Sequence, residues 1–170
     1  MNSKQIVAAV SVVILVVILV YPAFAAGTIS VALGSLKIEN ADHVYVIVTA
    51  VLVHEKGQSS TAGWKSIFNQ TQLFDLVSLM NSTKPLVTSQ SLPVASYDSI
   101  RLVVSNVTWV FNKNTTELTP ASRNLDSSIG FTLATGTDVS ITILLAGSQQ
   151  TVGTSKFFAG NVTATVTQKS

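Results

Sequence analysis

The chain contains no cysteine among its 170 residues. It therefore has no disulfide bond and no thiolate nucleophile. Its stability must come from packing, from hydrogen bonds, or from contacts with other subunits.

Charge is also scarce, because only 11% of the residues are charged, against about a quarter in an average soluble protein. The ten Lys and Arg and eight Asp and Glu residues are scattered, with no basic block or stripe. Electrostatic binding of nucleic acid needs such a concentration, so we expect no nucleic-acid partner. Ser, Thr, Asn and Gln replace the charged residues and remain hydrated at any pH.

Motifs that carry chemistry are missing as well. No Gly-x-Ser-x-Gly elbow and no phosphate-binding glycine loop occurs, and Asp75, Asp98 and Asp126 are well separated. On one regular strand His43 and His54 would face opposite sides and lie about 35 Å apart. We therefore expect no enzymatic activity, no cofactor and no metal site.

Three further side chains allow two interpretations each. Arg101, between Ile100 and Leu102, is either a buried cation with a partner or a half-exposed residue whose stem covers apolar surface. Trp64 and Trp109 either pack in the core or offer exposed rings on which a sugar can stack.

An apolar run from Ile6 to Val20, interrupted only by Ser11, is the most informative feature that is present, and Lys4 precedes it. The run has the length of a signal-peptide core, and Ala23-Phe24-Ala25 is the small-x-small pattern that a signal peptidase reads. Cleavage between Ala25 and Ala26 divides the chain into a signal peptide, residues 1–25, and one extracellular domain, residues 26–170.

The alternative is an uncleaved transmembrane helix over residues 6–26. No charged residue occurs in this stretch, and about 20 apolar residues are enough to cross a bilayer. Both interpretations bring the leader to a membrane and place the rest of the chain outside, in the extracellular space or on the cell surface.

The sequence contains more Asn-x-Ser/Thr sequons than chance would give. An attached glycan is bulky and faces solvent, so each sequon predicts an exposed asparagine. Covalent N-glycans would also keep a surface with few charges soluble. The candidate acceptors are Asn69, Asn81, Asn106, Asn114 and Asn161.

Period-two patterns dominate the chain after the leader. Ile29, Val31 and Leu33 alternate with small residues, and residues 43–54 are apolar on both faces, which predicts a central strand. Residues 100–111 form another long strand, whose alternation changes phase at Ser105-Asn106 and predicts a bulge there. Residues 112–128 form a long, mostly polar connection between predicted strands.

Further alternating segments occupy residues 129–133, 139–145 and 161–167. Together the patterns predict an all-β fold, an antiparallel β-sandwich of about seven or eight strands. The expected architecture is immunoglobulin-like or prealbumin-like, behind one hydrophobic N-terminal helix.

The order of these signals resembles a known family. The residues that carry the resemblance are Gly27-Thr28-Ile29-Ser30-Val31, Asp42-His43-Val44-Tyr45-Val46, Gly63-Trp64, Phe74-Asp75-Leu76 and Tyr97-Asp98-Ser99-Ile100-Arg101-Leu102. They are similar to a secreted β-sandwich family of archaeal and bacterial surface proteins, known only as domain of unknown function 4382. The resemblance spans Gly27 to Leu145 and implies a fold and a surface location rather than a chemistry.

The chain departs from the family pattern at the strands that open and close the domain. Gly34-Ser35-Leu36 replaces an acidic, proline-containing turn, and a Thr/Val strand replaces an ending in Leu-Arg-Pro. These departures leave open whether the first strand pairs within its own domain. The general build is also similar to subunits of archaeal thread filaments, pilins that are linked head to tail by donated N-terminal strands.

The leading hypothesis is therefore a glycosylated, non-enzymatic filament subunit. Its donor strand would carry Ile29, Val31 and Leu33 into an open sheet edge of a neighbouring copy. One alternative is a membrane-anchored surface or virion domain that does not polymerise. A second is a sugar-binding adhesin that uses exposed tryptophans.

Overall fold

The computed structural model describes residues 25–169, and the regular structure in that range consists of β-strands. The all-β prediction is thus confirmed for this part of the chain, which holds no helix long and apolar enough to span a membrane. The predicted signal peptide or anchor helix lies outside the described residues, apart from its junction at Ala25 and Ala26. The ten strands are β1 (Ala26–Ser35), β2 (His43–Glu55), β3 (Trp64–Phe68), β4 (Gln72–Asp75), β5 (Thr83–Pro93), β6 (Ala95–Phe111), β7 (Asn114–Pro120), β8 (Asn124–Leu133), β9 (Asp138–Val152) and β10 (Ser155–Lys169).

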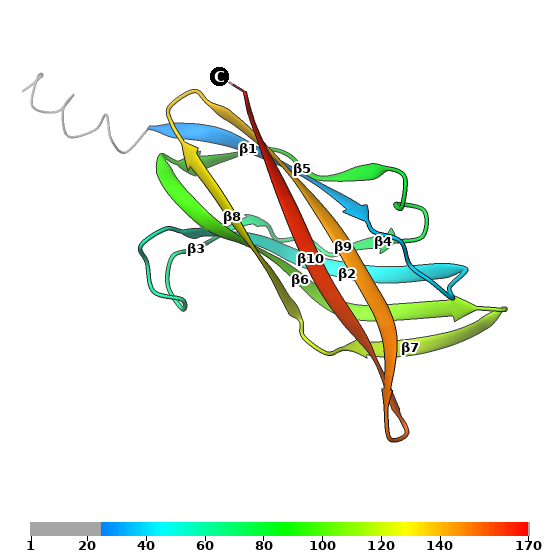
Figure 1. Cartoon of the computed structure of the whole chain (residues 1–170). Coiled ribbons are helices and arrows are strands. Elements are labelled where there is room, and N and C mark those ends of the chain that lie inside the picture. The colour runs from blue at the N-terminus through cyan, green and yellow to red at the C-terminus, as the bar shows by residue number, and fades with distance from the viewer. Residues whose placement is uncertain (1–24, 170) are drawn as a thin grey trace, which may run out of the picture.

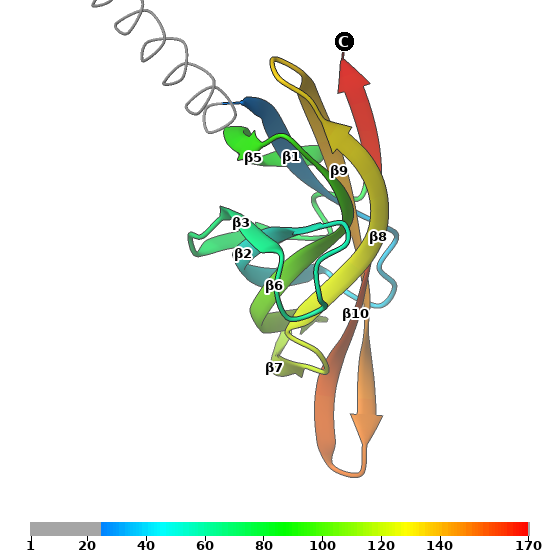
Figure 2. The same ribbon diagram turned by 90° about the vertical axis from the view of Figure 1, so that its left-hand side faces the viewer.

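All ten strands belong to one hydrogen-bonded sheet that folds around a single apolar core (Figures 1 and 2). The path runs β3-β2-β6-β7-β10-β9-β1-β5, with β4 also paired to β2 and β8 also paired to β6. The two ends of the path, β3 and β5, lie on either side of a groove of about 400 Å³. β8 also binds β10 through side chains, since Ala164 N donates to Ser127 Oγ and Gln168 Nε2 donates to Thr132 O.

This topology is more complex than the simple antiparallel sandwich that the periodicity predicts. β1 runs parallel to β9, and β7 runs parallel to β10 over two residue pairs, whereas the other pairings of the described strands are antiparallel. The ten strands exceed the expected seven or eight because β4, β5 and β7 are short or mostly polar.

The core is formed mainly by β2 and β6 on one side and by β1 and β9 on the other. Val44, Val46 and Val48 of β2 point inward, but the next inward residues are Val51 and Val53. The register shift between Val48 and Ala50 explains this change of phase, because Thr49 is an extra residue opposite β6. The bulge was not expected from the sequence.

β6 contains two bulges. The first leaves Ser105 unpaired between the Val104 and Asn106 pairs, as the change of phase at Ser105-Asn106 predicts. The second leaves Asp98 unpaired opposite the step from His54 to Glu55. A bulge re-aims the side chain of the extra residue, and this one turns Asp98 toward β2.

The β9–β10 hairpin projects beyond the rest of the sheet, at the end opposite the C-terminus (Figures 1 and 2). We call its outer part, residues 147–160, the arm. Residues 151–156 at its tip are exposed, and Val152 exposes 67% of its surface.

Candidate functional site

The segment predicted as a donor strand forms β1, which occupies a slot between β5 and β9. β5 pairs antiparallel on one side and β9 pairs parallel on the other, from Thr28–Asp138 to Ser35–Leu145. Ile29, Val31 and Leu33 are 1%, 2% and 0% exposed. The three predicted residues therefore point into the core of their own chain.

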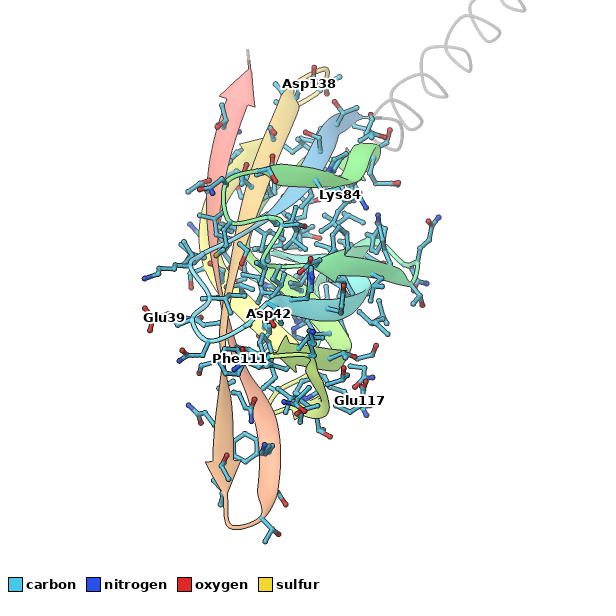
Figure 3. All side chains as sticks on the ribbon, turned by 90° about the vertical axis from the view of Figure 1, so that its right-hand side faces the viewer. Glu39, Asp42, Lys84, Phe111, Glu117 and Asp138 are labelled. Atoms are coloured by element: carbon cyan, nitrogen blue, oxygen red, sulfur yellow. The ribbon has the colours of Figure 1, made fainter. Side chains whose placement is uncertain are left out.

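Small residues on β1 allow its neighbours to approach closely. A Cβ atom on Gly27 would lie 2.6 Å from Leu133 Cγ, and one on Gly34 would lie 2.9 Å from Leu144 Cδ2. The strand is also fixed at its ends, where Thr28 N donates to Thr137 O and Leu36 N donates to Leu145 O. The Thr28 hydroxyl donates to the carboxylate of Asp138, which is labelled in Figure 3. Side chain and main chain together specify β1 for this slot.

All five sequon asparagines are exposed, as each sequon predicts. Asn69, Asn81 and Asn114 lie in or beside turns, whereas Asn106 and Asn161 lie within β6 and β10. The amide of Asn106 donates to Glu117, labelled in Figure 3, over 2.9 Å. None of the five asparagines lies on β1, β5 or β9, the strands that make up the slot.

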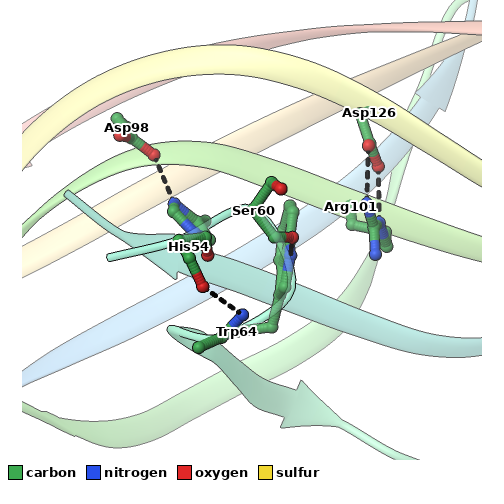
Figure 4. Close-up of polar contacts among 8 residues, drawn as sticks. His54, Ser60, Trp64, Asp98, Arg101 and Asp126 are labelled. Atoms are coloured by element: carbon green, nitrogen blue, oxygen red, sulfur yellow. Dashed lines mark hydrogen bonds and ion pairs between the residues drawn. The ribbon is translucent and has the colours of Figure 1, made fainter. Parts of the chain in front are cut away.

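A cluster of polar and aromatic side chains lies on the outer face of the sheet (Figure 4). His54, Trp64 and Arg101 come together there from three adjacent strands. The ring centroids of His54 and Trp64 are 5.0 Å apart, and the Arg101 guanidinium lies 4.0 Å from the centroid of the Trp64 ring. We call these three residues with Asp98 and Asp126 the outer cluster.

Arg101 is partly exposed and is paired with a carboxylate. Its Nε and Nη2 atoms donate to the two carboxylate oxygens of Asp126, each over 2.7 Å, and this bonding raises the pKa of the guanidinium. The side chain of Arg101 is 23% exposed, and its flat group covers Trp64. This is the half-exposed strand arginine of the sequence-based interpretation, with a carboxylate partner added.

His54 binds oxygen atoms with both ring nitrogens. Nδ1 lies 2.9 Å from Asp98 Oδ1, and Nε2 lies 3.0 Å from the carbonyl oxygen of Ser59. The Ser59 carbonyl, followed by the Asp98 carboxylate, raises the pKa of His54 above its ordinary value. The sequence gives no sign of this arrangement except the position of His54 just before a polar loop.

The predicted separation of the two histidines on opposite faces is wrong. The bulge at Thr49 shifts the phase of β2, so His43 and His54 both point away from the core. His43 Nδ1 binds Asp75 over 2.8 Å, and His54 binds Asp98. Each of Asp75, Asp98 and Asp126 thus has its own cationic or imidazole partner, and no group of three potential metal ligands occurs within residues 25–169.

The two tryptophans differ from an exposed sugar-stacking pair. Trp109 is 5% exposed, and its Nε1 atom donates to the carbonyl of Asn40. Trp64 is half-buried, with Arg101 over its ring and Nε1 donating to Ser60 O. Trp109 therefore packs in the core, and Arg101 covers one face of the Trp64 ring.

The fold is an all-β domain in which His43, His54 and Arg101 each pair with an aspartate. The family described as "Domain of unknown function (DUF4382)" matches residues 26–164, and the chain belongs to this family. The resemblance of the sequence to this family is thereby confirmed. The family description assigns no activity.

One solved structure that is similar in part is that of a "putative cell adhesion protein" from Bacteroides eggerthii, with a TM-score of 0.32 and 12% sequence identity. The alignment covers 84% of this chain and 57% of that one, so this chain spans little more than half the length of that protein. Among curated proteins, none matches this chain.

Proposed function

We propose that the chain is a non-enzymatic structural protein of the cell surface, a glycosylated subunit of an extracellular filament. In the filament, β1 of one copy fills the slot between β5 and β9 of the next copy. The observation that carries this proposal is the burial of Ile29, Val31 and Leu33 in a slot with a paired strand on either side.

The slot supports exchange because the contacts that hold β1 there do not require β1 to belong to the same chain. Removing β1 would expose two unpaired strand edges and an apolar groove, which an identical strand from a neighbour would refill with the same contacts. Each of the three buried side chains stabilises the inserted strand by about 1.5–3 kcal/mol on full burial. Head-to-tail transfer of this kind does not close on itself and extends a fibre.

The connection between β1 and β2 supplies the hinge. Residues 36–42 lie between the two strands, and Leu36, Lys37, Glu39 and Asn40 are exposed. Straightening seven residues spans at most about 25 Å, enough to carry β1 out of its own domain. Asn40 has a positive φ of 56°, so an extended hinge would also relieve an unusual backbone conformation.

The positions of the sequons leave the strands of the slot free of glycans, which also favours strand exchange. A glycan on β1, β5 or β9 would obstruct an incoming strand, and none of the five sequons lies on these strands. Secretion through the leader would bring β1 out first, with its start at the predicted cleavage site. No nucleic acid, cofactor or metal has a role in this proposal.

The decisive test is a disulfide between β1 and the strand beside it. The chain has no cysteine, so the only thiols of a Ser30→Cys, Ser140→Cys variant are the two introduced at these paired positions. Assembly by exchange predicts a ladder of covalent oligomers on a non-reducing gel of surface material. A band at the monomer position alone would show that β1 remains in its own chain and would refute the proposal.

A matched control shares one of the two positions. Ser140 and Thr167 are paired between β9 and β10, which are joined by a tight hairpin. A Ser140→Cys, Thr167→Cys variant should therefore give an intrachain bond and no ladder. A ladder in this control as well would indicate random collision rather than strand exchange.

A second candidate function is a membrane-anchored surface domain that does not polymerise. The pairing of β1 within a single chain favours it, because such a domain needs no neighbour to complete its sheet. This function requires the leader to be retained. Mass spectrometry of the intact protein decides the matter, since a chain that begins at Ala26 excludes an anchor.

A further inference from the structure

The β2–β3 loop, residues 56–63, is held to the outer face of the sheet in two different ways. Its ends are fixed by main-chain hydrogen bonds, because Glu55 N donates to Gly63 O and Lys56 N donates to Ser96 O. Its tip is held by two aromatic rings of the sheet. His54 contacts the carbonyl of Ser59, and Trp64 donates to the carbonyl of Ser60.

These two ring contacts respond differently to pH. The indole of Trp64 donates at every pH, whereas a neutral imidazole has one N–H and one lone pair. His54 has an oxygen at 2.9 Å from Nδ1 and another at 3.0 Å from Nε2. Both oxygens can be satisfied only by the doubly protonated imidazolium. Because the hydrogen bond to the Asp98 carboxylate is the charge-assisted one, a neutral ring keeps its proton on Nδ1 and directs the lone pair of Nε2 at the Ser59 carbonyl oxygen.

From this geometry we infer that His54 is a proton-dependent clamp, which holds the tip of the β2–β3 loop on the sheet when protonated and releases it when neutral. The clamp joins three segments, since His54 belongs to β2, Asp98 to β6 and Ser59 to the loop. It requires the bulge that turns Asp98 toward His54. It also requires Gly63, whose φ is +83° and where a Cβ atom would lie 2.5 Å from Gln58 Cβ.

The charges around His54 favour the cation. Asp98 faces it from β6, while Glu55, its neighbour on β2, forms an ion pair with Lys65 of β3. Arg101 of β6 lies beyond the Trp64 ring and is paired with Asp126 of β8, and Lys56 projects from the exposed loop. Asp98 is therefore the carboxylate in direct contact, and its side chain is 40% exposed, which gives protons a route from solvent.

The direction of the pH effect follows from linkage. The pKa of His54 in the folded protein is raised above its value of 6.5 in the free side chain. The clamp is thus complete below about pH 6.5, and its stabilisation is lost as the pH rises through the raised pKa of the folded protein. Acidic surroundings close the loop, and alkaline surroundings open it.

Amide hydrogen exchange in residues 56–62 tests this inference in the full domain, from about pH 5 to about pH 8, where histidine changes its charge. The rates are corrected for the intrinsic pH dependence of exchange. The Ala62 amide, which donates to Ser59 O, is the most direct reporter. We expect its protection to fall about tenfold across this range, as for the loss of one charge-assisted hydrogen bond.

Two histidine variants separate the clamp from general effects of pH. In His54→Gln the protection of the loop should no longer depend on pH. In His43→Gln, which removes the other histidine of β2 and its contact with Asp75, the dependence should be as in the wild type. Equal protection of the wild-type loop at both ends of the range, or an unchanged dependence in His54→Gln, would overturn the inference.

Asp98→Asn gives an independent measurement that does not require the loop to open. This variant retains an oxygen acceptor but removes the negative charge. The NMR titration midpoint of the His54 ring should therefore move to lower pH. An unmoved His54 midpoint would show that Asp98 does not stabilise the cation, and the clamp would be refuted.

Discussion

Gly147 and Gly160 face each other across the β9–β10 hairpin because an aromatic ring occupies the space of their missing side chains. A Cβ atom on Gly147 would lie 2.1 Å from two ring atoms of Phe158, and one on Gly160 would lie 2.7 Å from another. Phe158 itself is 1% exposed. A ring packed over glycines is a known way of stabilising a sheet where glycine leaves a gap, and here it fixes the root of the arm.

Gly147→Ala should consequently destabilise the domain. Because the new methyl group would collide with Phe158, the ring must leave its position, at a cost of about 1–3 kcal/mol. Urea unfolding followed by fluorescence measures this cost. Gly130→Ala in β8 is the matched control, since nothing lies within 4 Å of its Cβ position; it should be neutral or stabilising by up to about 1 kcal/mol.

Arg101 illustrates why the geometry of a cation counts for more than its charge. Its guanidinium binds both oxygens of Asp126 and covers Trp64, which a lysine ammonium cannot do at once. Arg101→Lys should lower the free energy of unfolding by about 0.5–1 kcal/mol, a small figure because Asp126 is half-exposed. Lys37→Ala breaks an ion pair whose side chains are 80% and 71% exposed, and its melting temperature should not change. Equal losses of stability in Arg101→Lys and Lys37→Ala would show that the contact of the guanidinium with both oxygens of Asp126 adds nothing beyond its charge.

Strands with long apolar runs or regular alternation could be predicted from the sequence, and strands with neither could not. β2, β6 and β9 were expected from their apolar residues, and the bulge at Ser105 was expected from a change of phase. β5 was missed because its buried residues, Leu86, Val87 and Leu92, follow no period where its register with β1 shifts.

The outer cluster could not be predicted from the sequence, for a related reason. β2 is apolar on both faces, so the extra residue at Thr49 leaves no visible break in its alternation. The sequence therefore placed His43 and His54 on opposite faces. The contact between His54 and Asp98 depends on a second bulge whose position no short-range pattern reveals. The buried face of β1, in contrast, could be predicted because alternation there is regular from Ile29 to Leu33.

The tip of the arm, residues 151–156, is a segment that the body of the domain does not need. Residues 151–156 are exposed and hydrogen-bond only across the hairpin, from Thr151–Lys156 to Val152–Ser155. Replacing these six residues with an Asn-Gly turn keeps the Gln150–Phe157 pair and suits a two-residue hairpin. The free energy of unfolding should change by less than about 0.5 kcal/mol. A larger loss in urea unfolding would show that the tip stabilises the body.

Three independent boundaries coincide at one position in the whole molecule. The predicted signal-peptidase site lies between Ala25 and Ala26, β1 begins at Ala26, and the match to the family begins at residue 26. A processed chain would thus begin with the strand that fills the slot, with no folded segment before it. The leader and the donor strand would be adjacent parts of one export and assembly route.

Mass spectrometry of the protein purified from its own cell surface would test this route as a whole. We expect a chain that begins at Ala26 and carries glycans at Asn69, Asn81 and Asn114, because sequons in turns are the most accessible.

Asn106 should be unmodified, since its amide nitrogen, the atom to which a glycan is attached, donates to Glu117. Glu117→Ala frees that amide and should raise occupancy at Asn106 without changing it at Asn114. A chain recovered from soluble cell extract with Met1 and no glycan would show that the domain is not exported, and the surface function would fail with it.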